Sequence, residues 1–312
     1  QLIWQVKLLD LDDPGEEFSK EQQEALKNLK LGSANCDNFP LAGFRQALSG
    51  NPPLLKARAL QHSGPDTDPC LTPPEARYRG PENQLYRVEV HKGGPAGEAT
   101  FKWSRENGSV LGGWTATQGN RLSVSGIHDS LHGFEATGWV ELTHDDYELQ
   151  GKPGTLVQLS KVEGDQLTLN PATANGTLPV SSDPVTLHNP KIRRWDQRKR
   201  EDLELTGGAI LIEEGSGEAG WIELENGIQV QFQAPAQGQP PHLYRSGDYW
   251  FIPARTATGD VEWPGDPDNP QALPPQGIQH HYAPLALAGT ATGGLIHLRR
   301  AFSGLAVCID EG

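Results

Sequence analysis

Residues suited to metal binding or proton transfer are concentrated in the C-terminal third of the chain. Asp260 and Glu262 precede the adjacent pair His280 and His281. A histidine and two carboxylates could bind a divalent metal ion or form an acid/base pair. Neighbouring residues on a strand point to opposite faces, so the two histidines are poorly placed to bind one ion together. The simpler interpretation is that one imidazole packs against a tryptophan while the other hydrogen-bonds a carbonyl group.

A second acidic group lies in the middle of the chain. Asp145, Asp146 and Glu148 flank Tyr147, and paired carboxylates perform glycoside hydrolysis. In an acidic protein, however, neighbouring acids in a loop are usually only solvated. The sequence contains no GxSxG, HExxH or P-loop pattern, so these signatures of catalysis are missing. We therefore assign no catalytic residue and no cofactor, and the sequence favours a protein that is not an enzyme.

Aromatic side chains are the other candidates for a functional contact. Tyr249, Trp250, Trp263 and Tyr282 lie in the same C-terminal third. Flat rings on a sheet or loop can stack on sugars or anchor a protein partner. Most tryptophans of such a chain belong to the core, so contact with a partner or a cell-surface glycan is a hypothesis for these four residues.

The three cysteines, Cys36, Cys70 and Cys308, show no CxxC spacing, which argues against a structural zinc site. Cys36 and Cys70 flank an irregular, proline-rich segment. A disulfide between them and two free thiols are both compatible with the sequence.

The element that organises the rest of the chain is a hairpin predicted over residues 82–110. Tyr86, Val88 and Val90 alternate with charged residues, and Phe101 and Trp103 do so after a glycine-rich turn. This period of two predicts antiparallel strands with one apolar and one charged face. Such a pair is not stable alone, so further sheet must cover the apolar face.

The remaining segments predict a mainly β fold of several short-stranded antiparallel sheets or small β-barrels, with one or two short helices. A capping pattern predicts a helix over residues 20–31, and residues 138–170 predict several short strands of a barrel. Asn226 and Gly227 form a strong hairpin signal. We expect an N-terminal β-rich region over residues 1–133, a barrel-like module over 134–172 and a second β-rich region over 173–312.

Composition limits the classes of partner. The 312 residues include 36 Gly and 25 Pro and carry a net charge of -14, which argues against a nucleic-acid binder. The basic run at residues 193–200 is therefore expected to be solvated or to lie in an interface. No stretch is long and apolar enough to span a membrane, and no signal peptide is visible. The chain starts at Gln1 and has no methionine, so we expect an excised or processed piece.

Six segments of the chain stand out as long, specific motifs: ENQLYRVEVH, TFKWSRENGSV, GWVEL, RRWD, YRSGDYWFIPARTATGDVEWP and GIQHHYAPLA. Together they resemble a bacterial domain family of unassigned function that is associated with gene clusters for phage-tail-like contractile injection systems. The resemblance extends from about Trp4 to Leu287. Family members usually begin with a segment containing Gly-Asp-Phe-Ser-Arg, which this sequence lacks. The family provides no catalytic residues to carry over.

The resemblance implies a non-enzymatic structural or adhesive part of a tail-like particle, such as a baseplate, fibre or surface accessory component. Its partners would be other particle subunits and further copies of itself. It would be extracellular or particle-associated after assembly in the cytoplasm. Two alternatives remain from the residues: a carbohydrate-binding or polysaccharide-degrading protein, and a metal-dependent hydrolase.

Overall fold

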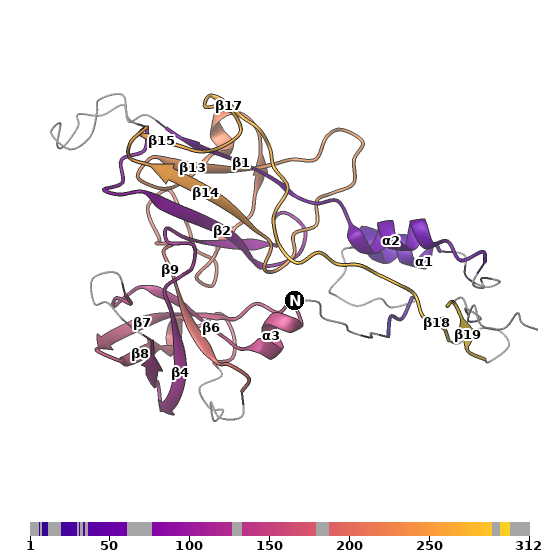
Figure 1. The fold of residues 1–312 in the computed structure, drawn as a ribbon, viewed down its shortest axis with the longest axis horizontal. Coiled ribbons are helices and arrows are strands. Elements are labelled where there is room, and N and C mark those ends of the chain that lie inside the picture. The colour runs from indigo at the N-terminus through magenta and orange to yellow at the C-terminus, as the bar shows by residue number, and fades with distance from the viewer. Residues whose placement is uncertain are drawn as a thin grey trace, which may run out of the picture. The chain divides into compact units, whose positions relative to one another are not determined.

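The computed structural model describes residues 6, 8–11, 20–29, 31, 34, 37–60, 77–126, 133–178, 187–288 and 294–299. The chain divides into two compact units, one of residues 51–278 and one of residues 1–50 with 279–312. The described part is mainly β, with several antiparallel sheets and three short α-helices (Figure 1), which confirms the predicted fold class.

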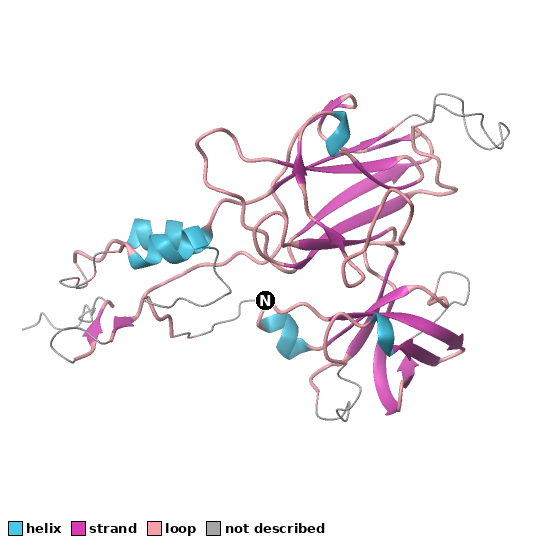
Figure 2. Cartoon of the chain, turned by 180° about the vertical axis from the view of Figure 1, so that it is seen from behind, coloured by secondary structure: helices cyan, strands magenta, loops and turns pink. Residues whose placement is uncertain are grey.

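Two sheets pack face to face in the larger unit (Figures 1 and 2). The first has the order β10-β3-β2-β14-β15, with strands Ile210–Leu211, Thr100–Ser104, Gln84–Lys92, Tyr249–Arg255 and Asp260–Val261. In the second, β13 (Ile228–Gln233) pairs with β1 (Leu54–Ala59), β11 (Glu214–Gly215) and β12 (Ile222–Glu225). Each sheet can therefore bury one apolar face against the other.

The apolar face of the predicted hairpin forms the centre of this packing. Tyr86 and Val88 are fully buried on β2, and they lie on the face that carries Phe101 of β3. The ring of Phe232 on β13 meets the rings of Phe101 and Trp250, with centroids 5.1 and 5.9 Å away. The predicted hairpin and its inward face are confirmed.

Six further strands of the larger unit close into a barrel in the order β4-β5-β8-β7-β6-β9. Their bounds are Leu111–Gln118, Arg121–Ser125, Gln166–Asn170, Thr155–Glu163, Trp139–Thr143 and Lys191–Trp195. Residues 134–172 supply β6, β7 and β8, while the other three strands come from outside that range. The interior is apolar, with Leu122, Val140, Val157, Leu167 and Ile192 fully buried.

Short elements complete the larger unit. Helix α3 spans Asp145–Leu149, single 3-10 turns lie at Pro171–Thr173 and Glu218–Gly220, and β16 (Gly265–Asp266) pairs with β17 (Asn269–Pro270). The predicted Asn-Gly turn joins β12 to β13, and its residues Asn226 and Gly227 have φ of 50° and 83°. Both values lie in the left-handed region that this tight turn requires, which confirms the sequence signal.

The smaller unit contains helices α1 (Lys20–Lys27) and α2 (Leu41–Ser49) and the pair β18 (Ala286–Leu287) and β19 (Ile296–His297). Leu26 and Leu48 are buried between the helices, and the side-chain amide of Gln22 donates to the carbonyl of Ala47 at 2.8 Å. Among the described helices, none has the length and apolar character needed to cross a membrane.

Candidate functional site

The charged face of the central hairpin is buried, although the sequence predicted a hairpin with only one buried face. Glu89 and His91 on β2 and Lys102 on β3 are 6%, 3% and 2% exposed. Residues of the barrel cover them, because Lys102 contacts both Glu141 of β6 and Trp195 of β9. The half-buried interpretation was therefore wrong: both faces of this hairpin lie inside the molecule.

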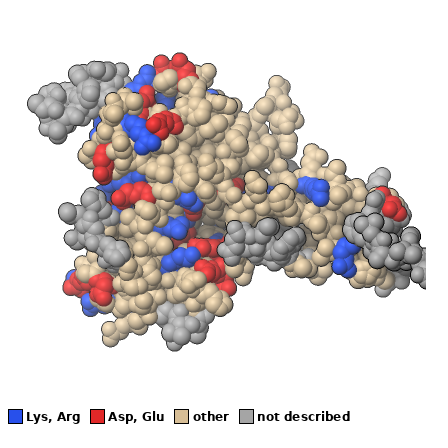
Figure 3. All heavy atoms as spheres, in the orientation of Figure 1, with Lys and Arg blue, Asp and Glu red and all other residues tan. Residues whose placement is uncertain are grey.

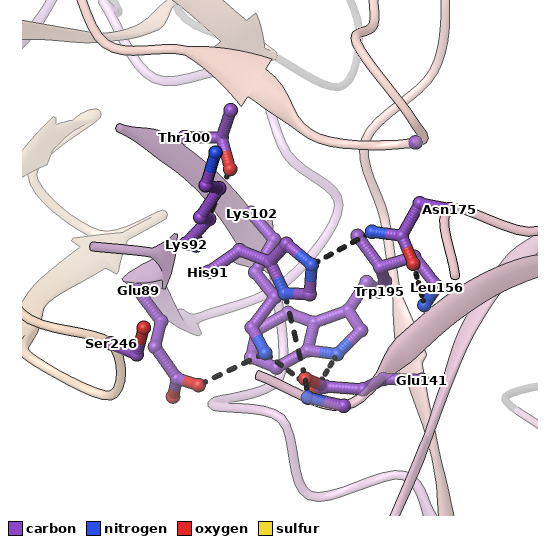
Figure 4. A network of polar contacts seen from close by, with 12 residues as sticks. Glu89, His91, Lys92, Thr100, Lys102, Glu141, Leu156, Asn175, Trp195 and Ser246 are labelled. Atoms are coloured by element: carbon purple, nitrogen blue, oxygen red, sulfur yellow. Dashed lines mark hydrogen bonds and ion pairs between the residues drawn. The ribbon is translucent and has the colours of Figure 1, made fainter. Parts of the chain in front are cut away.

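The covered side chains form a network of alternating charge (Figure 4). Lys102 Nζ lies 2.5 Å from Glu141 Oε2 and 3.2 Å from Glu89 Oε1, with its ammonium 4.4 Å from the centroid of the Trp195 ring. Arg87 Nε donates to Glu89 Oε2 at 2.6 Å. Two cations and two carboxylates thus balance, which limits the cost of burying charge.

The Glu141 carboxylate is the most heavily bonded group of the network. Its Oε1 accepts the backbone N–H of Gly154 at 3.1 Å, and its Oε2 accepts the indole N–H of Trp195 at 2.9 Å. Burial alone would raise the pKa of Glu141, but the charge of Lys102 and the bond with His91 outweigh it and hold that pKa well below its usual range,.

His91 has a defined tautomer because Asn175 is oriented by the backbone. The side-chain oxygen of Asn175 accepts the N–H of Leu156 at 2.9 Å, so its amide NH₂ faces His91 Nε2, also at 2.9 Å. Nε2 therefore accepts, and the imidazole proton sits on Nδ1, 3.6 Å from Glu141 Oε1,. Burial lowers the pKa of His91, which keeps the ring neutral.

The segment RRWD, residues 193–196, extends the joint, which is the buried contact between the sheet that contains β2 and β3 and the barrel. Its Arg194, Trp195 and Asp196 are buried, and the backbone N–H of Asp196 donates to the carbonyl of Trp103 at 2.9 Å. Asp196 also accepts the backbone N–H of Arg105 at 2.9 Å and pairs with Arg194 at 3.1 Å. These three residues therefore lie between the barrel and β3 within the chain, while Arg198 and Lys199 of the same basic run are exposed.

The comparisons with known proteins identify the family of the chain. A family model described as a family of unknown function (DUF6519) matches residues 31–296. The chain belongs to this family. No curated protein and no solved structure matches the sequence. The matched range includes all of the residues of the buried network, so the joint lies within the DUF6519 region.

The aromatic residues singled out from the sequence have different environments in the DUF6519 chain. Trp250 is 2% exposed and its indole N–H donates to the carbonyl of Leu273 at 2.9 Å. The predicted contact of Trp250 with a partner or glycan does not fit this position, because β14 directs its ring into the sandwich core. Tyr249 is half-buried beneath the Arg87 guanidinium, 3.7 Å from the ring centroid. Trp263 is partly buried against the same core.

Tyr282 belongs to the smaller unit, where it packs against the two helices. Its ring stacks with that of His280 at a centroid distance of 6.1 Å. His280 and His281 are exposed in that unit.

The other members of the suggested metal site have partners of their own in the larger unit. Asp260 Oδ1 accepts the N–H of Val261 at 2.8 Å, and Glu262 pairs with Arg255 at 2.9 Å. Within the described residues, no group of three His, Cys, Asp or Glu could hold a metal ion. Cys36 and Cys70 lie outside the described residues.

The acidic residues of α3 are each engaged by neighbours from around β9. Asp145 accepts from Asn189 at 2.6 Å, Asp146 pairs with His188 at 3.2 Å, and Lys191 reaches Glu148 at 2.7 Å. This is a surface ion-pair cluster that fixes the helix, in keeping with the solvated alternative.

Sequence reasoning missed the buried network itself. A signal was present, since Glu89 and Lys102 lie directly opposite each other on the paired strands, and opposite charges at such positions attract. The sequence could not predict that Glu141 and Asn175 lie next to them. Those two residues come from the barrel, and no local sequence pattern indicates how the barrel packs on the sheet.

Proposed function

We propose that the chain is a non-enzymatic structural or adhesive component of a phage-tail-like contractile injection particle, in a baseplate, fibre or surface accessory position. The observation that supports this most is that charged residues from three of the motifs are buried together. Glu89 and His91 of ENQLYRVEVH, Lys102 of TFKWSRENGSV and Glu141 of GWVEL meet in one buried network. The most distinctive charged residues of the sequence therefore hold the architecture together.

The burial of these groups also argues against catalysis by them. Glu89, His91, Lys102 and Glu141 are between 2% and 6% exposed, and an enzyme must bring its acid, base or nucleophile within hydrogen-bond reach of a substrate. A network closed to solvent cannot do so without opening the joint between sheet and barrel. The same closure makes the sandwich and barrel a rigid support for surface loops, where contacts with partners are commonly made.

The surface of the described residues carries both basic and acidic side chains. Basic and acidic side chains of the described residues lie beside one another on the face drawn in Figure 3, as is common at the polar rim of a protein interface. Partners in this proposal are other particle subunits and further copies of the chain, with a cell-surface glycan as the target of an adhesive part. Tyr249, Trp263 and Tyr282 remain the aromatic candidates for such contacts.

Deleting the gene in the source cells tests this proposal. Particles purified from the deletion strain and from the parent are compared by electron microscopy and by mass spectrometry of their subunits. We expect particles that lack a defined component or fail to assemble, with restoration by the intact gene. The proposal would be contradicted if the chain is absent from the parent's particles and its deletion leaves their yield, shape and composition unchanged.

A further inference from the structure

We propose that Lys102 and Glu141 condense into an intramolecular amide bond that links β3 covalently to β6. This inference goes beyond the proposed function and does not depend on it. The two groups are in direct contact, with Lys102 Nζ 2.5 Å from Glu141 Oε2, and their residues are 2% and 5% exposed. An amine and a carboxyl group held together away from water have the proximity that condensation requires.

The surrounding groups are placed to assist the reaction. Glu89 Oε1 lies 3.2 Å from Lys102 Nζ and can accept a proton from it. On the other side, the Gly154 N–H donates to Glu141 Oε1 at 3.1 Å, and the Nδ1–H of His91 lies 3.6 Å from the same oxygen. The Gly154 donor is therefore placed to stabilise negative charge that develops on Oε1, while His91 Nδ1 lies nearby but outside hydrogen-bond distance,.

Gly154 is fixed at this position by space as well as by its hydrogen bond. A Cβ atom on it would lie 2.6 Å from both Glu141 Cγ and the carbonyl oxygen of Leu142. Only glycine therefore lets the backbone N–H approach Glu141 Oε1 this closely. On the far side of Lys102, the Trp195 ring lies 4.4 Å from the ammonium and shields it from water.

The reaction balances without any co-reactant. The charged pair predominates, since the pKa of Glu141 is lowered, and the reacting form is the neutral pair, in which Lys102 has transferred one ammonium proton to Glu141 Oε2 to give an amine and a carboxylic acid. Nζ then attacks Cδ, a C–N bond forms, and negative charge collects on Oε1. Glu89 takes a second proton from the nitrogen and passes it to the hydroxyl at Oε2, whose bond to Cδ breaks. One water leaves, Glu89 is regenerated, and the carbonyl of the new amide retains Oε1.

Burial also favours the product. An ammonium and a carboxylate removed from water each carry a desolvation penalty that their attraction only partly offsets. Condensation removes both charges and leaves a neutral amide whose oxygen keeps the Gly154 donor. Because the site is buried, little water can return to it, and this opposes hydrolysis of the amide.

The intact mass of the purified full-length chain, measured under denaturing conditions, tests the proposal directly. We expect a mass lower than that of the sequence by one water. Trypsin would leave Lys102 uncut and yield one branched peptide joining residues 93–105 to residues 122–161, since Lys152 precedes Pro153 and resists cleavage. A chain of full sequence mass, with a separate peptide ending at Lys102, would overturn the proposal.

Three variants locate the bond and assign the roles. Lys102→Arg keeps the positive charge but has no attacking amine, so its mass should match its sequence. Lys161→Arg is the matched control at an exposed ion pair, 2.7 Å from Glu163, and should keep the water deficit. Glu89→Gln should lose most of the cross-linked fraction while remaining folded by circular dichroism. A deficit that survives Lys102→Arg would place the lost water elsewhere and refute the bond.

An unchanged cross-linked fraction in Glu89→Gln would overturn the role assigned to Glu89 as the proton acceptor. The particle experiments and the mass measurement are independent. A chain without the bond can still be a particle component, and a cross-linked chain can be absent from particles.

Discussion

Individual charged residues in this chain serve the fold rather than a reaction at the surface. Lys102 is enclosed by Glu89, Glu141 and the Trp195 ring, so each charge has a partner at short range. Buried charges persist only when they are paired in this way. Deleting one of these charges leaves its partner uncompensated, whereas Lys102→Arg keeps the positive charge and Glu89→Gln leaves Glu141 beside Lys102.

The stability of the fold should depend on the protonation of His91. Its pKa is lowered by burial, so below about pH 6.5 the unfolded chain binds a proton that the folded chain does not. The free energy of unfolding should therefore fall as the pH drops below that value, by at most about 1.4 kcal/mol per pH unit from this residue. Urea titrations at several pH values between about 7.5 and 5.5 measure this free energy of unfolding on both sides of the ordinary pKa of histidine.

His91→Gln removes the titrating group and should flatten the pH dependence. His281→Gln, at an exposed histidine of the smaller unit, is the matched control and should leave it as in the wild type. Equal slopes for the wild type and His91→Gln would show that the imidazole is not held neutral in the folded state.

Trp103 tests the inward face of the hairpin. Its side chain is 3% exposed between Tyr86 and the rest of the sandwich core, so Trp103→Ala should lower the free energy of unfolding by about 3–5 kcal/mol. Leu149→Ala, at a residue that is 45% exposed, should change it by no more than about 0.5 kcal/mol. A cost under about 1 kcal/mol for Trp103→Ala would contradict the packing.

At the scale of strands and turns, the sequence predicted the elements whose signals are local. Alternation identified β2 and β3 with the correct inward residues, and Asn226-Gly227 identified the turn between β12 and β13. It could not show what covers the second face of a strand. Glu89 and Lys102 look like solvated residues in the sequence, and only the docking of the barrel makes them internal. Trp250 lies opposite Val88 on the paired strands and so faces the sandwich core, which the unbroken apolar run at residues 249–252 could not indicate.

The two hairpin glycines Gly227 and Gly164 should respond differently to alanine. Both have positive φ, 83° and 61°, so each substitution carries about 1–2 kcal/mol of backbone strain. A Cβ on Gly227 would also lie 2.3 Å from the carbonyl oxygen of Arg77, whereas nothing lies within 4 Å at Gly164. In denaturant titrations Gly227→Ala should thus be clearly the more destabilising, and equal costs would argue against the close contact at Arg77.

At the scale of the whole molecule, the larger unit contains its own cores. Among the residues that the structure describes, the apolar clusters of the sandwich and the barrel are formed by residues within 51–278. A fragment of residues 51–278 should therefore fold alone, with a cooperative thermal transition and near-ultraviolet circular dichroism of packed tryptophans. A fragment that shows neither would mean that residues outside this range are needed to complete the fold.

The central claim, that this chain is a building part of a tail-like particle, is tested most directly by where the native protein sediments. Lysates of the source cells are fractionated by ultracentrifugation, and the high-mass fraction is analysed by mass spectrometry. The account predicts that the chain sediments together with sheath and tube proteins. A chain found only in the light fraction, alone or bound to glycan, would contradict it and would favour a carbohydrate-binding role.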